Sequence, residues 1–77
     1  MYFSNESILY NTIGSNIKRC RQNAGLTQVQ LAEKVGISIS YLSKIEAAGC
    51  DKSFSIAVLN DIANALNIEI ISFFKEE

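Results

Sequence analysis

The sequence predicts a small all-α domain of five compactly packed helices, and three observations lead to this prediction. The chain has 77 residues, of which 48% are hydrophobic and none is proline, so a single core can be built from uninterrupted helices. Apolar residues recur at intervals of three and four, the period of an α-helix, over most of the chain. A Ser or Thr also precedes three of these segments, where its oxygen can accept a hydrogen bond from a free backbone N–H.

The first helix is expected to run from about Asn11 or Thr12 to Asn23. Gly25 ends it, because glycine readily adopts the left-handed conformation that commonly follows a helix. Residues 1–11 form either an N-terminal arm or an extension of this helix. Its apolar face is made of Ile13, Ile17, Cys20 and Ala24.

The next three helices are expected to begin with the same local pattern. A capping Ser or Thr comes first, and one apolar residue before it pairs with another at the fourth helical position, forming a hydrophobic staple. At Thr27, Gln30 also completes a capping box. The caps and their helices are Thr27 before Gln28–Val35, Ser38 before Ile39–Ala47, and Ser55 before Ile56–Leu66. The staple pairs are Leu26 with Leu31, Ile37 with Leu42, and Phe54 with Leu59.

The two helices on either side of Gly36 are predicted to form a helix-turn-helix. Gly36 permits the positive φ of a tight turn, and Ala32 is small enough for two helices to cross closely. Leu42 and Ile45 would anchor the second helix, so that its other face is free to lie in a DNA major groove.

The last segment, residues 67–77, is expected to contain a short helix over about Ile70–Lys75. This helix would complete a single domain that spans residues 1–77 and has a four-helix core in residues 12–66. Its side chains are apolar nearly all round, and one monomer cannot bury every side of so short a helix. We therefore expect a homodimer contact here, made by Ile70, Ile71, Phe73 and Phe74. The alternative is that the N-terminal residues cover this surplus with Tyr2, Phe3, Ile8 and Leu9.

Charge is distributed unevenly around a formal net charge of −1. Residues 14–52 hold six lysines and arginines against three acidic residues, whereas residues 53–77 hold one lysine against four acidic residues. A modest basic surface in the middle of the chain is therefore compatible with nucleic acid, although the net charge alone would not indicate it.

The run GLTQ…LAEKVGIS.SYLS.IE, within residues 13–46, and the continuation SIAVLNDIANALNIEIISFF resemble the Cro/lambda-repressor-type (XRE-like) helix-turn-helix domain. The resemblance covers about Ile13 to Phe74. It implies a five-helix fold and a transcriptional regulator that binds a palindromic double-stranded DNA operator as a homodimer. By analogy, the proline-free loop after the third helix and the FF ending favour restriction–modification controllers over prophage repressors and antitoxin-type regulators.

The resemblance also implies roles for individual residues. Gln28 matches a glutamine that touches a backbone phosphate and buttresses the base-reading side chains, while Arg21 and Glu46 match an ion pair. Lys44 could reach guanine or a phosphate, and Ile39 could touch a thymine methyl group. The candidate DNA-binding residues are Thr27, Gln28, Ser38, Ile39, Ser40, Tyr41, Ser43, Lys44, Lys52, Arg21 and Lys18.

Plainer interpretations of these residues stay open. Ser38 could act only as a cap, Tyr41 could be packing, and Arg21–Glu46 could be a purely structural salt bridge. Ile39 stands where many relatives place a polar side chain, and the loop after the third helix is about two residues longer than usual. Ile39 and the acidic net charge favour an alternative function, a protein–protein interaction module on a helix-turn-helix scaffold that has lost DNA binding.

Other classes of protein find little support in the sequence. The chain has no histidine, no glycine-rich phosphate loop and no clustered acid pair, so we expect no enzyme and no cofactor. Cys20 and Cys50 are lone thiols without metal-ligand spacing, so no metal site is expected. We see no signal peptide, no membrane span and no small-molecule ligand, and we expect a cytoplasmic protein.

Overall fold

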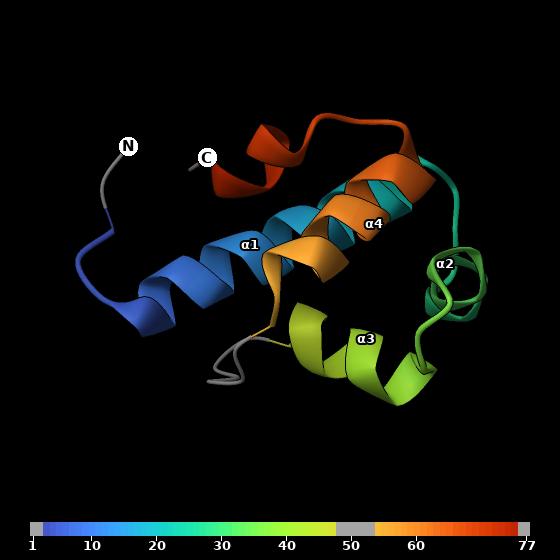
Figure 1. Cartoon of the computed structure of the whole chain (residues 1–77), viewed down its shortest axis with the longest axis horizontal. Coiled ribbons are helices and arrows are strands. Elements are labelled where there is room, and N and C mark those ends of the chain that lie inside the picture. The colour runs from blue at the N-terminus through green and yellow to red at the C-terminus, as the bar shows by residue number, and fades with distance from the viewer. Residues whose placement is uncertain (1–2, 48–53, 76–77) are drawn as a thin grey trace.

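The computed structural model describes residues 3–47 and 54–75. Within these ranges it contains four α-helices, one 3₁₀ helix and no strand (Figure 1), which confirms the all-α class. The elements are α1 (Glu6–Asn23), α2 (Gln28–Val35), α3 (Ile39–Glu46), α4 (Ile56–Leu66) and η1 (Ile70–Phe74). The expected fifth α-helix is therefore a 3₁₀ helix, and α3 ends one residue earlier than predicted.

α1 begins at Glu6 rather than at Asn11 or Thr12. Asn5 caps it, because its side-chain oxygen accepts a hydrogen bond of 2.9 Å from the backbone N–H of Ile8. The carboxylate of Glu6 lies in the first turn, where the helix dipole favours negative charge. Residues 6–10 therefore extend the first helix and are not an arm.

The three predicted caps are all present. The hydroxyl oxygens of Thr27, Ser38 and Ser55 each accept from the backbone N–H three residues later, at 3.1, 3.0 and 3.1 Å. The Gln30 side chain returns a bond of 2.8 Å to the Thr27 N–H and completes the capping box. Local sequence therefore sets where α2, α3 and α4 begin.

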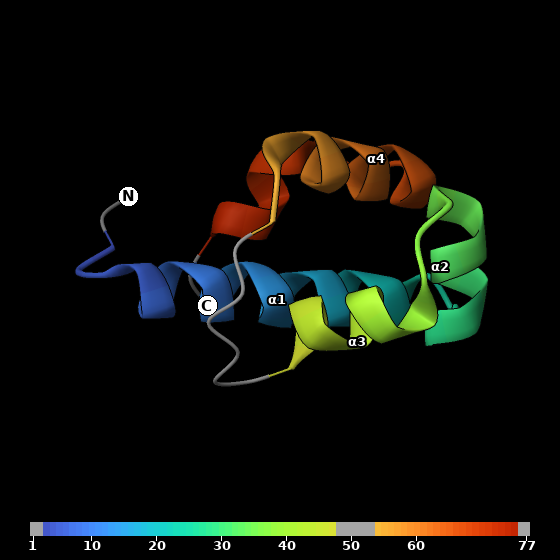
Figure 2. The same cartoon turned by 60° about the horizontal axis from the view of Figure 1, so that its bottom comes forward.

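α1 is the central element of the fold. Figure 2 shows it running between α3 on one side and α4 with η1 on the other. Each of these elements contributes buried side chains to one core. The buried apolar residues are Ile13, Ile17, Leu31, Ala32, Leu42, Ile45, Leu59, Ile62, Ala63 and Phe73.

η1 divides its apolar side chains between the core and the surface. A 3₁₀ helix has three residues per turn, so Ile70 and Phe73 lie on one face and Ile71 on another. Phe73 has no exposed surface, while Ile71 is 57% exposed. The expectation that Phe73 contacts a second subunit is therefore wrong, because this side chain fills the core of its own chain. Ile70 and Phe74 are half-buried and pack against that core.

Candidate nucleic-acid interface

The turn between α2 and α3 has the geometry of a helix-turn-helix. Gly36 has a φ of 85°, and its N–H donates to the carbonyl of Ala32 at 2.8 Å. The Ile37 N–H donates to the same carbonyl at 3.1 Å, which closes the end of α2 and directs the chain into α3. The positive φ predicted at Gly36 is confirmed.

α3 has one face in the protein core and one in solvent. Leu42 and Ile45 are buried, as predicted. Tyr41 and Ser43 are half-buried at the border between the two faces. Ile39 is 46% exposed, so a large apolar side chain lies on the solvent face of α3. The candidate residues that α3 and its cap leave exposed together are Ser38, Ile39, Ser40 and Lys44.

A buried ion pair ties α1 to the last turn of α3. Arg21 donates from Nε to Glu46 Oε2 at 2.8 Å and from Nη2 to Glu46 Oε1 at 3.0 Å. A third bond of 2.8 Å runs from Nη1 to the carbonyl of Leu26. Arg21 is 8% exposed, and its guanidinium is bonded to protein acceptors. This side chain is therefore not free to contact DNA, although the resemblance had placed it among the candidate DNA-binding residues.

Gln28 extends this ion pair to the border of the exposed face of α3. Its Nε2 donates to Glu46 Oε1 at 3.0 Å, and its Oε1 accepts from the Ser43 hydroxyl at 2.9 Å. The Glu46 carboxylate can only accept, so it requires the amide nitrogen on its side and leaves the amide oxygen for Ser43. Gln28 thereby buttresses Ser43 from α2. The Ser43 proton is used inside the protein, so its oxygen can only accept from a ligand.

Gly14 is a structural residue that the sequence reasoning missed. A Cβ at this position would collide with the backbone carbonyl of Ile45, so α1 and α3 touch main chain to main chain. The available signal was a glycine inside an otherwise helical pattern, which costs about 1 kcal/mol relative to alanine and usually has a packing reason.

The remaining candidate residues lie outside α3. Thr27 is exposed, but its hydroxyl serves as the cap of α2. Lys18 is exposed on α1. Lys52 and Cys50 lie outside the described residues. Cys20 is a free thiol that is half-buried and packs against the core.

Two further properties concern only the part of the chain that the structure describes. No group of three or more His, Cys, Asp or Glu side chains is placed to hold a metal ion. None of the helices has both the length and the apolar character needed to cross a membrane.

Comparison with known proteins identifies the family. Residues 17–73 match the helix-turn-helix family HTH_3. The chain is 44% identical over 66 residues to the immunity repressor protein of Bacillus phage phi105, a match that covers 86% of this chain and 44% of that repressor.

Two solved controller proteins share the fold. The restriction–modification controller C.AhdI from Aeromonas hydrophila is 28% identical with a TM-score of 0.77, covering 84% of this chain and 96% of that one. The controller C.Esp1396I, solved as a nucleoprotein complex, is 30% identical with a TM-score of 0.74, covering 86% and 83%. The chain spans about half the length of the curated relatives it matches. These matches and the geometry of α2 and α3 agree that this chain belongs to the helix-turn-helix family HTH_3 of DNA-binding transcriptional regulators.

Proposed function

We propose that this chain binds a palindromic double-stranded DNA operator as a homodimer and represses transcription from it in the cytoplasm. The observation that carries the proposal is the bonded series Arg21–Glu46–Gln28–Ser43, which fixes α3 from both α1 and α2. Binding groups held rigidly before contact lose less conformational entropy when they bind. A helix fixed in this way, with its outer face left open, suits insertion into a major groove.

The exposed face of α3 offers three kinds of base contact. The Lys44 ammonium can donate to guanine O6 and N7, the Ser40 hydroxyl can donate or accept, and Ile39 can pack against a thymine methyl group. Backbone N–H groups at the start of α2, beside Thr27 and Gln28, favour a DNA phosphate. Direct hydrogen-bond readout is limited, and apolar contact through Ile39 supplies part of the specificity.

Low charge makes a dimer necessary for useful affinity. Each phosphate neutralised by a lysine or arginine contributes about −0.9 to the slope of log K against log salt, and one subunit offers few such contacts. Two subunits double the contacts and place their α3 helices about 34 Å apart, one turn of B-DNA. The exposed side chain of Ile71 on η1 is our candidate for the centre of the dimer contact.

The relatives support a repressor role. One relative is named as an immunity repressor, and the others discussed above are restriction–modification controllers. The identity to the repressor is 44%, against 28% and 30% to the controllers, so we favour a repressor over the controller role suggested by the loop and the FF ending. Occupation of an operator by the dimer would block a promoter that overlaps it.

Selection from a library of random duplex DNA tests this proposal. The wild-type protein is expected to enrich one palindromic consensus. Ser40→Asp places a carboxylate on the exposed face of α3 without touching the core, and it should abolish the enrichment by repelling the DNA. Lys75→Asp, the control, makes a larger change of charge after η1, −2 instead of −1, and should still leave the consensus unchanged. Enrichment that Ser40→Asp does not alter would place the DNA on another face.

A protein-binding module is the second candidate function. It is favoured by Ile39, which is 46% exposed, and by the formal net charge of −1. Such a module would return no enriched DNA from the wild-type selection. The same experiment therefore separates the two functions.

A further inference from the structure

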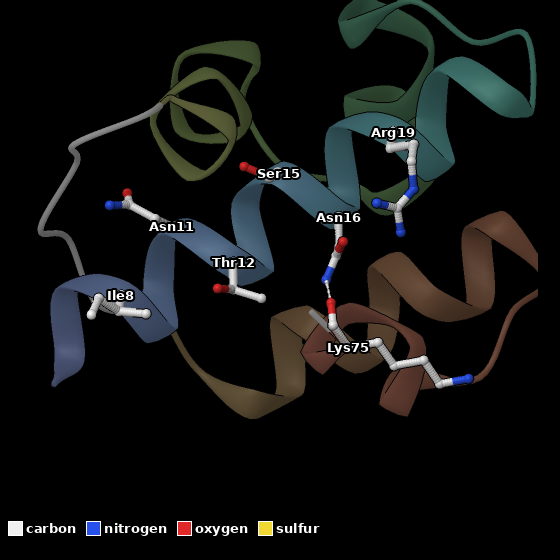
Figure 3. Close-up of a pocket in the computed structure, with 7 residues that line it drawn as sticks. All are labelled: Ile8, Asn11, Thr12, Ser15, Asn16, Arg19 and Lys75. Carbon is white, nitrogen blue, oxygen red and sulfur yellow. Dashed lines mark hydrogen bonds between the residues drawn. The ribbon is translucent and has the colours of Figure 1, made fainter. Parts of the chain in front are cut away.

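A buried asparagine joins α1 to the end of η1. Asn16 is 2% exposed, and its Nδ2 donates to the carbonyls of Phe73 and Lys75, both at 2.7 Å. The two acceptors are 57 and 59 residues away in the sequence. Figure 3 shows the bond to Lys75 at the edge of an open hollow along α1. We call Asn16 and these two carbonyls the η1 clamp.

The η1 clamp supplies donors that η1 cannot provide for itself. The last carbonyls of any helix lack intrahelical partners, and a buried carbonyl without a donor is costly. η1 ends at Phe74, so the carbonyls of Phe73 and Lys75 lie at its end. The side-chain amide of Asn16 donates its two hydrogens to these two carbonyls. An apolar side chain at position 16 would continue the apolar face of α1 but would leave both carbonyls without this donor.

The same stretch of α1 also holds α3. Gly14 lies against the Ile45 carbonyl, and Arg21 is bonded to Glu46. Asn16 stands between these two contacts in the sequence, and α1 separates α3 from η1 in space (Figure 2). One rigid helix therefore fixes the position of η1 relative to α3.

The orientation of η1 is fixed along with its position. Phe73 fills the core from one face, while Ile71 is 57% exposed on another.

We propose that Asn16 is a positioning residue that sets the half-site spacing accepted by the dimer. This inference rests on the proposed function, with η1 as the dimer contact. A displacement of η1 relative to α3 occurs in both subunits of the dimer. The two displacements add, so the separation between the two α3 helices changes by twice the displacement in one subunit. One base pair corresponds to about 3.4 Å along the duplex, so small displacements select a different spacer.

The test compares Asn16→Ala with the wild type on three kinds of duplex. They carry the selected palindrome, the same half-sites moved together or apart by one or two base pairs, and a single half-site. The wild type is expected to prefer the selected spacing by on the order of 100-fold. At any other spacing the dimer cannot bind both half-sites at once, so the gain in affinity from linked binding is lost. Asn16→Ala should bind the single half-site like the wild type, within about twofold, and prefer the selected spacing by less than about tenfold.

A stability-matched control separates positioning from folding. Ile62→Val removes a buried methyl group from α4 and should lower thermal stability while keeping the spacing preference. If Asn16→Ala does not fold, Asn16→Ser, which retains one hydroxyl donor, carries the same comparison. A folded Asn16 variant with the wild-type spacing preference would overturn the inference. A wild-type protein that selects no DNA, or that binds half-sites without any spacing preference, would overturn the proposed dimer on its operator. A wild-type spacing preference that the folded Asn16 variants share would overturn only the role of Asn16.

Discussion

Gly14 is the point where a single missing side chain decides how closely two helices approach. Glycine lowers the intrinsic stability of α1 relative to alanine, but its missing Cβ allows α1 to contact the main chain of α3 at Ile45. The neighbouring atom is the backbone carbonyl oxygen of Ile45 in the last turn of α3. This oxygen cannot rotate away as the end of a flexible side chain could. The position of α3 therefore depends on the absence of a Cβ at residue 14.

Gly14→Ala is expected to destabilise the protein although alanine is the better helix former. The gain in helix propensity is about 1 kcal/mol. The added methyl group must push α3 away, and overpacking of this kind typically costs about 1–3 kcal/mol. Urea denaturation should show a lower free energy of unfolding, whereas Ser15→Ala, at the exposed neighbour, should not lower it. Equal stability of the wild type and Gly14→Ala would mean that α1 and α3 do not meet closely in solution.

Contacts over short sequence distances could be predicted from the residues themselves, whereas contacts over long distances could be named only where the family resemblance supplied the partner, as for Arg21 and Glu46. The Thr27, Ser38 and Ser55 caps each bond three residues ahead, so a four-residue pattern contains the whole signal. Asn16 also carried a signal, because it is a polar residue on the apolar face between Ile13 and Ile17. Its partners could not be named, since nothing local links residue 16 to residues 73 and 75.

At the scale of elements, α1 and η1 differ most from the sequence prediction. The start of α1 was placed too late, although Leu9 continues its apolar face four residues before Ile13 and Asn5 offers a cap. All four apolar side chains of η1 were expected to take part in a dimer contact, yet the three-residue period of η1 turns Phe73 inward. Helical type decides which side chains of a short segment face the core, and composition alone did not reveal that type.

Lys44 on α3 provides a quantitative test at the same scale. If its ammonium neutralises one phosphate, Lys44→Ala should reduce the salt slope of operator binding by about 0.9 per subunit, or about 1.8 for a dimer. Lys44 is exposed, so the melting temperature should stay unchanged. Fluorescence anisotropy at several salt concentrations measures the slope. Lys75→Ala removes the same charge after η1 while keeping the clamped carbonyl, and it should leave the slope as it is. An unaltered slope in Lys44→Ala would assign the phosphate contact to another residue.

At the scale of the whole molecule, the fold separates two surfaces across α1. The candidate DNA-facing helix lies on one side, and η1 with the exposed Ile71 lies on the other (Figure 2). A palindromic operator requires such a separation, because each subunit must contact DNA and its partner at once. The sequence could suggest both surfaces from composition, but their relative placement follows only from the packing of α1.

Ile71→Asp is expected to convert the proposed dimer into a monomer. A carboxylate at the centre of an apolar contact would lose its water without gaining a partner. Light scattering at tens of micromolar protein measures the mass directly. Val29→Asp is a matched control, because Val29 is 50% exposed on α2 compared with 57% for Ile71, and it should leave the mass unchanged. A wild-type monomer at these concentrations would contradict the dimer contact on η1.

The burial of Phe73 also bears on how the protein folds during its own synthesis. Ribosomes extend a chain from the N-terminus at about 5–20 residues per second, and a domain folds once its core residues are available. Here the helix proposed to read DNA is complete at Glu46, whereas the aromatic ring that fills the core arrives at residue 73. A nascent chain paused before that residue would expose Ile13 and Ile17 to chaperones and proteases. Competence to bind an operator would therefore be acquired only after translation has passed Phe73.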